Sequence, residues 1–152
     1  MQTHIIARTL VFNEDGMLLL LVRSNEDDYR PGGHDFPGGQ IDEGEELITG
    51  ALRELREETG LDLGLADMQL VCADAKSGFN ASAQANVNMV KLIFVAKVVS
   101  AHVELSDEHQ AHDWVNVDAA IERMRAEDYP SGVVALEYLI ENNIAPDLWS
   151  RR

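Results

Sequence analysis

Three glutamates crowd together in the segment RELREETG, residues 53–60. On a helix, like charges three or four residues apart cost about 0.2–0.5 kcal/mol per pair, and nothing nearby in the sequence offsets that in full. Carboxylates are the hard oxygen ligands that Mg²⁺ and Mn²⁺ prefer, and a bound cation would make the crowding tolerable. The grouping of Glu54, Glu57 and Glu58 therefore suggests a metal site.

The three carboxylates need a helix to hold them on one edge. Residues 45–59 have helical periodicity and are followed by Gly60, a residue type that commonly ends helices. At about 100° per residue, the glutamates fall within an arc of roughly 100° beside the apolar face. Taken alone, such an arrangement is usually just a solvated acidic face, so the metal hypothesis depends on what surrounds the helix. The apolar face comprises Ile48, Ala51, Leu52 and Leu55.

The loop before this helix strengthens the metal hypothesis. The segment FPGGQIDEGE, residues 36–45, contains Pro37 followed by Gly38 and Gly39. This combination predicts a rigid turn with close backbone approach. A carbonyl oxygen of that turn could complete a metal site begun by the helix. The acidic residues within 42–46 suit the positive end of the helix dipole.

The spacing of these residues matches a known pattern. Gly39, Glu45 and the run over residues 53–61 fit G-x5-E-x7-R-E-U-x-E-E-x-G-U, in which U is a bulky aliphatic residue. Leu55 and Leu61 fill the two U positions, and every other specified position is also filled. The segment resembles the Nudix box. The resemblance implies the α/β Nudix fold, a mixed β-sheet sandwiched between α-helices.

The resemblance also implies a reaction class and a cofactor. Nudix enzymes hydrolyse a nucleoside diphosphate linked to another moiety, with Mg²⁺ or Mn²⁺. Position by position, Glu54, Glu57 and Glu58 would bind the metal, with help from the Gly39 carbonyl. The physical chemistry agrees, because pyrophosphate hydrolysis needs charge neutralised on phosphate oxygens and a water placed for in-line attack.

The remaining catalytic expectations concern bracing and proton transfer. Arg53 lies four residues before Glu57 and can brace either that carboxylate or Glu45, its partner in the resemblance. Two residues are candidates for the general base, Glu57 and Glu108. Glu108 lies in the segment LSDEHQAHDWV, where the alternative is a solvated loop carboxylate. Two nearby histidines are interpreted as surface residues, with metal binding as the weaker alternative: His109 and His112.

Few residues in the sequence indicate which substrate is bound. Phe79, in an expected loop, could stack on a base, or it could pack on its own scaffold. Arg23 and Arg30 lie on the N-terminal side of the box and could contact phosphates, although isolated arginines are mostly surface residues. We expect a MutT-like pyrophosphohydrolase that cleaves a nucleoside triphosphate to a nucleoside monophosphate and pyrophosphate. The alternatives are a hydrolase of another nucleoside diphosphate compound (coenzyme A, ADP-ribose or dinucleoside polyphosphate type) and a non-catalytic Nudix-fold binding module.

The elements that would position these residues follow from hydrophobic periodicity and turn signals. The turn at residues 13–16 predicts a β-hairpin, and residues 25–40 and 76–88 predict loops. We expect strands at residues 4–12, 17–23, 68–75, 89–99 and 113–117. We expect helices at residues 45–59, 118–125 and 132–142.

The length and net charge of the chain limit the kinds of partner that it can bind. A chain of 152 residues is expected to form a single domain over residues 1–152. A net charge of −15 excludes a long nucleic acid as partner but not a small nucleotide substrate accompanied by divalent cations. The single cysteine, Cys72, predicts a reducing, cytoplasmic setting, and the absence of a signal-like or long apolar run predicts no membrane association. A homodimer is compatible with the sequence.

Overall fold

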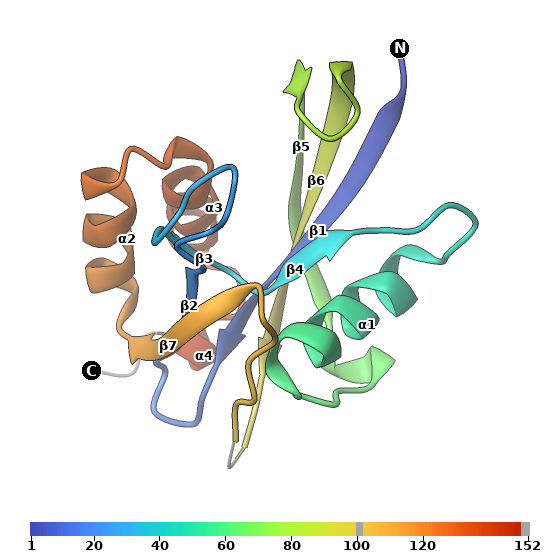
Figure 1. Cartoon of the computed structure of the whole chain (residues 1–152). Helices are drawn as coiled ribbons and strands as arrows, with labels where there is room; N and C mark the ends of the chain where they lie inside the picture. Colours follow the sequence, from blue (N-terminus) through green and yellow to red (C-terminus); the bar gives the residue numbers. More distant parts are fainter. Residues whose placement is uncertain (100–101, 150–152) are drawn as a thin grey trace.

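The computed structural model describes residues 1–99 and 102–149 (Figure 1). The strands are β1 Thr3–Phe12, β2 Leu18–Arg23, β3 His34–Asp35, β4 Gly38–Gln40, β5 Gln69–Asn80, β6 Ala85–Lys97 and β7 His109–Val115. The helices are α1 Leu47–Thr59, the short 3-10 helix η1 Leu65–Asp67, α2 Val117–Ala126, α3 Pro130–Glu141 and α4 Pro146–Trp149. The predicted five strands and three helices occur in the expected order, together with four short elements that were not predicted: β3, β4, η1 and α4.

The strands form one mixed sheet with β1 near its middle. β1 runs parallel to β6 and antiparallel to β2 and β4. β2 pairs further with β3 and β7, and β6 pairs with β5. The expected hairpin of the first two strands is therefore confirmed. Its turn is held by Asn13, whose side chain accepts hydrogen bonds from the backbone of Asp15 and Met17.

Helices cover both faces of this sheet (Figure 1). Successive side chains of a strand point to opposite faces, so β1 and β6 each contribute to two apolar cores. On one face, Leu10 and Ile93 pack with residues of α2 and α3. On the other, Ala7 and Leu92 pack with Ala51 of α1. The predicted fold class, a mixed sheet between helices, is confirmed.

The prediction of a loop at residues 76–88 is wrong. β5 and β6 continue through it, and only residues 81–84 connect them. The cross-strand ladder runs to the pair Asn80–Ala85, and the Ser77 side chain donates to Asn88 across it at 2.7 Å. Most side chains here are small, polar and exposed, so the strands extend beyond the core with no apolar alternation to reveal them.

Other predicted boundaries also shift. The expected loop at residues 25–40 contains β3 and β4, which are too short to leave a periodic pattern. The last strand begins at His109, earlier than predicted, and pairs along β2. The first helix begins at Leu47, so Glu45 lies in the loop before it. Among the described residues, no helix is both long enough and apolar enough to cross a bilayer.

Candidate active site

A cavity of about 600 Å³ opens where α1, β4 and the start of β7 meet. Acidic side chains dominate its walls, and two half-buried arginines, Arg8 and Arg23, contribute positive charge. The backbone of β4 forms another part of the wall. The lining residues are Arg8, Arg23, Ser24, Glu26, Asp27, Asp28, Gly38, Gly39, Gln40, Glu54, Glu58, Asp107, Glu108 and His109.

The three glutamates of α1 are buried to different degrees. Leu55 is fully buried and fixes the rotation of the helix against the sheet. Glu58 is only 4% exposed, whereas the Glu57 side chain is 56% exposed. The helix ends as predicted, because Gly60 adopts the left-handed conformation with φ 74° and donates its N–H to the Arg56 carbonyl.

The predicted apolar face of α1 is only partly correct. Ala51 and Leu55 are buried, and Leu52 is half-buried. Ile48 is exposed, because it lies in the first turn, where the neighbouring Leu47 is also exposed. After its exposed first turn, α1 is therefore held by buried residues that extend from Gly50 to its C-terminal end, and the glutamates lie within this part.

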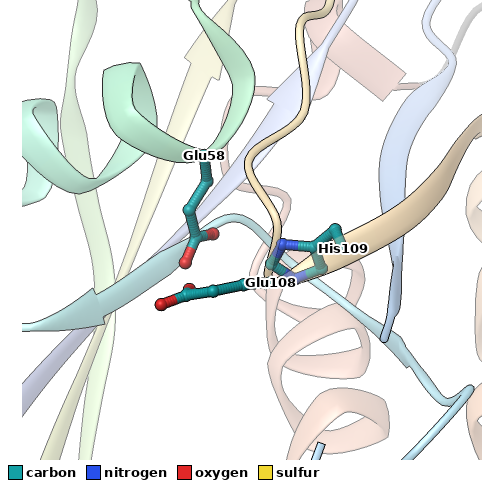
Figure 2. A group of neighbouring side chains, drawn as sticks. All are labelled: Glu58, Glu108 and His109. Carbon is teal, nitrogen blue, oxygen red and sulfur yellow. The ribbon is translucent and has the colours of Figure 1, made fainter. Parts of the chain in front are cut away.

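Glu58 lies close to Glu108, the residue before β7, and to His109, the first residue of β7 (Figure 2). One ligand atom from each of Glu58, Glu108 and His109 lies within 4.8 Å of the other two. His109 is buried, and neither of its ring nitrogens has a hydrogen-bond partner among the described residues. The interpretation of His109 as a surface residue is wrong, whereas His112 is exposed as predicted. Carboxylate oxygens around an unpartnered imidazole form a group that could hold a metal ion.

The burial of the cavity's carboxyl groups is a second reason to expect a bound cation. Burial raises the pKa of Glu58 to about 8, against the attraction of Arg8 and a hydrogen bond from the Gly38 N–H. Burial also raises the pKa of Glu54, against its hydrogen bond with Arg53. Neighbouring carboxylates, Glu108 among them, raise both values further. Without a cation these carboxyl groups either hold protons or leave excess negative charge in the cavity, and a bound cation would displace the protons and compensate that charge.

β4 lies in close contact with the Glu54 side chain of α1 at Gly39 and with the backbone of β1 at Gly38. A Cβ on Gly39 would lie 2.4 Å from a carboxylate oxygen of Glu54. A Cβ on Gly38 would lie 1.9 Å from the Ala7 carbonyl oxygen, and its φ of 153° also favours glycine. The turn therefore brings backbone against the glutamates, as the sequence predicted for Gly39.

Arg53 braces the acidic cluster. It donates two hydrogen bonds to Glu45, at 2.7 and 3.0 Å, so the expected pair forms. Its Nη1 atom also contacts Glu54 at 3.0 Å and Glu57 at 3.1 Å. The hydrogen bond with Arg53 lowers the pKa of Glu45 to about 2. One guanidinium thus joins the loop before α1 to two carboxylates of the helix.

A second charged network contributes to the cavity wall, and the sequence singled out its Arg23 but not Arg8 or Asp35. Arg8, from the middle of β1, donates to the carbonyls of Phe36 and Gly38 and lies 3.5 Å from Asp35. Arg23 donates to the same Asp35 carboxylate at 2.6 Å. Burial alone would raise the pKa of Asp35, but the attraction of both arginines outweighs it and the pKa is lowered. The sequence signal that could have revealed this network is the single arginine, Arg8, within the apolar strand segment HIIARTLVF.

The residues predicted to contact substrate are dispersed. Arg23 lines the acidic cavity, although both of its terminal nitrogens donate to carboxylates, those of Asp35 and Asp27. Arg30 stacks over the Tyr129 ring, with 3.7 Å between its guanidinium carbon and the ring centroid. Phe79 lies on β5, not in a loop, and lines a second cavity.

Comparison with known proteins identifies the family. The profile of the NUDIX domain matches residues 2–134. The chain belongs to the NUDIX domain family. The match begins just before β1, contains the box at residues 39–61 and ends within α3, which agrees with the Nudix resemblance. Membership supports a hydrolase, and the acidic cavity of this Nudix domain lies where its box glutamates meet β4.

Two sequences and one solved structure illustrate the proteins that this Nudix domain resembles. It is 34% identical over 94 residues to the bis(5'-nucleosyl)-tetraphosphatase (asymmetrical) of Rattus norvegicus, covering 60% of this chain and 61% of that one. It is 31% identical over 115 residues to a MutT-like protein of Streptomyces ambofaciens, covering 76% and 65%. The crystal structure of the MutT protein from Methanosarcina mazei Go1 superposes with a TM-score of 0.75 at 26% identity, covering 94% and 96%. The aligned regions span less than two thirds of the curated relatives' length.

Proposed function

We propose that the chain is a metal-dependent pyrophosphohydrolase that cleaves a nucleoside triphosphate to a nucleoside monophosphate and pyrophosphate. The observation that carries this proposal is the buried Glu58 carboxylate, which meets Glu108 and an unpartnered His109 in an acidic cavity. A purely structural role would leave that carboxylate paired with a nearby cation. Instead, its direct hydrogen-bond donor is the backbone N–H of Gly38.

The residues present suit a divalent cation. Glu54 and Glu58 line the cavity, whereas Glu57 is not among its lining residues and shares the Nη1 atom of Arg53 with Glu54. Together with the Gly39 carbonyl they form the oxygen-rich donor set that Mg²⁺ or Mn²⁺ prefers. A bound cation of this kind neutralises phosphate charge and lowers the pKa of a bound water.

Glu108 is the better placed of the two candidate bases. Its carboxylate lines the cavity, lies beside Glu58 and is exposed, so it can contact a water there. Glu57 instead directs its carboxylate to Arg53. We therefore assign proton abstraction from the attacking water to Glu108 and the positioning of the box carboxylates to Arg53 and Glu45.

One observation favours a second candidate substrate. The relative from Rattus norvegicus is named as a tetraphosphatase of bis(5'-nucleosyl) compounds. A dinucleoside tetraphosphate is also a linked nucleoside diphosphate, and the same water attack would cleave it. The triphosphate remains first, because the MutT structure matches nearly the whole length of both chains.

A substrate panel tests the proposal. Purified protein would be incubated with nucleoside triphosphates, dinucleoside tetraphosphates, ADP-ribose and coenzyme A, each with Mg²⁺, with Mn²⁺ or with EDTA. Phosphorus NMR would identify the products. We expect monophosphate and pyrophosphate from a triphosphate with either metal, and none with EDTA. Turnover of the dinucleoside compound alone would select the second candidate, and no turnover of any compound would refute both.

A further inference from the structure

A second cavity adjoins the acidic one. It measures about 360 Å³ and shares Arg8, Arg23 and Asp28 with the first, so one ligand can occupy both. Its surface is more apolar, and aromatic rings lie at its edge. Phe79 is 65% exposed and Tyr29 is 67% exposed, although both line the cavity. Exposed aromatic rings beside a phosphate site are suited to stacking on a planar base.

The inner wall of this cavity carries a hydrogen-bond chain with a fixed direction. The Tyr129 hydroxyl donates to the Asp35 carboxylate at 3.3 Å, so its oxygen is left to accept. Lys91 lies 3.4 Å from that hydroxyl oxygen and 3.2 Å from the Ser131 hydroxyl oxygen, and it donates to both. An ammonium group has three N–H donors, which leaves one for a ligand.

An acceptor lies next to this donor. Asp74 is directly opposite Lys91 in the register of β5 and β6, and both side chains line the cavity. Directly opposed residues share one face of a sheet, with their Cβ atoms about 5 Å apart. The wall therefore presents an N–H donor from Lys91 beside a carboxylate acceptor from Asp74.

We propose that this cavity binds a nucleobase with a lactam edge, through Lys91 donating to the carbonyl oxygen and Asp74 accepting from the adjacent N–H. Guanine, hypoxanthine and uracil have such an edge. Adenine carries an amino donor where guanine carries its carbonyl acceptor, so adenine would point a donor at Lys91. A polar site discriminates strongly against a ligand that leaves its groups unpaired. This inference rests on the proposed function, because the phosphates of the same ligand extend into the acidic cavity.

Binding of two uncleavable analogues tests the inference independently of turnover. The α,β-methylene analogues of GTP and ATP would be titrated into the protein by calorimetry with Mg²⁺ present. We expect the guanine analogue to bind at least about 10-fold more tightly. Lys91→Met should reduce that preference to about 2-fold or less, by weakening the guanine analogue. The matched control is Lys97→Met, an exposed position on the same strand, which should keep the wild-type preference.

A second variant covers the case in which Lys91→Met does not fold. Asp74 is exposed, so Asp74→Ala should fold, and it should weaken the guanine analogue more than the adenine analogue. Equal wild-type affinities, a preference for adenine, or an equal loss for both analogues would overturn the inference. Hydrolysis without base preference would overturn the inference alone. Base-selective binding without hydrolysis would overturn the proposed function alone.

Discussion

At the scale of single residues, Glu58 has the most distinctive setting. It is a carboxylate inside a packed domain, and its raised pKa reflects the cost of ionising it there. In metal-free protein the native state keeps the Glu58 proton at pH values where the unfolded chain has lost it. The native state then binds more protons than the unfolded state, so stability falls as pH rises from the unfolded pKa towards the folded one.

This gives a prediction for metal-free protein. With EDTA present, the free energy of unfolding should fall by roughly 4 kcal/mol between pH 4.5 and pH 8 relative to Glu58→Gln, which cannot ionise. Urea unfolding of both proteins at several pH values measures the difference between them. A difference that does not change with pH would mean that the carboxylate is not desolvated.

The candidate bases give a second prediction. Glu108→Gln should lower kcat by about 10²- to 10⁴-fold, because it removes the acceptor for the water proton. If Glu108 acts only as the base, the Mg²⁺ concentration for half-maximal rate should stay near that of the wild type; if it is also a metal ligand beside Glu58 and His109, that concentration should rise. Glu57→Gln, which removes a carboxylate that the box pattern assigns to the metal, should raise that concentration. Steady-state rates over a magnesium titration separate the two effects, and a Glu108→Gln titration that overlays the wild type would remove this residue from the mechanism.

At the scale of elements, the site depends on how closely β4 approaches α1. Gly39→Ala places a methyl group against the Glu54 carboxylate and should displace it. We expect a raised magnesium requirement and a rate at least about 10-fold lower, as a carboxylate loses its position. The control is Gly78→Ala on β5, where the nearest atom to the new Cβ is 3.8 Å away, at the end of the Met89 side chain. If the Gly39 and Gly78 variants have equal rates, the contact has no catalytic role.

Elements also differ in how far the sequence could predict them. α1 and its C-terminal Gly60 were predictable, because a long amphipathic pattern and a left-handed residue are local signals. The outer half of the β5–β6 hairpin was not, because its exposed polar residues pack against no core. The box residues and Arg53 were predictable from spacing. The burial of His109 was not, because it depends on the pairing of β7 with β2 across the chain.

At the scale of the whole molecule, the core around α3 is separate from the acidic cavity. α3 packs on the sheet face away from α1 and contributes no residue to the acidic cavity, although its Ser131 lines the second cavity. Leu136→Ala, in the core of α3, should lower the free energy of unfolding by about 2–5 kcal/mol while kcat of the folded protein stays near normal. Val134→Ala, at an exposed position of the same helix, should change stability by about 0.5 kcal/mol or less. Urea unfolding measures both, and equal losses would contradict this assignment of the core.

The central claim is that the acidic cavity is a metal-dependent pyrophosphohydrolase centre built around Glu58. The most direct measurement is the initial rate of nucleoside triphosphate hydrolysis by EDTA-treated protein during a Mg²⁺ titration, compared between wild type and Glu58→Gln. The account predicts no rate without metal, saturation of the wild-type rate with Mg²⁺, and a loss of about 10²-fold or more in Glu58→Gln at every metal concentration. Full turnover in EDTA, or a Glu58→Gln curve that overlays the wild type, would contradict it.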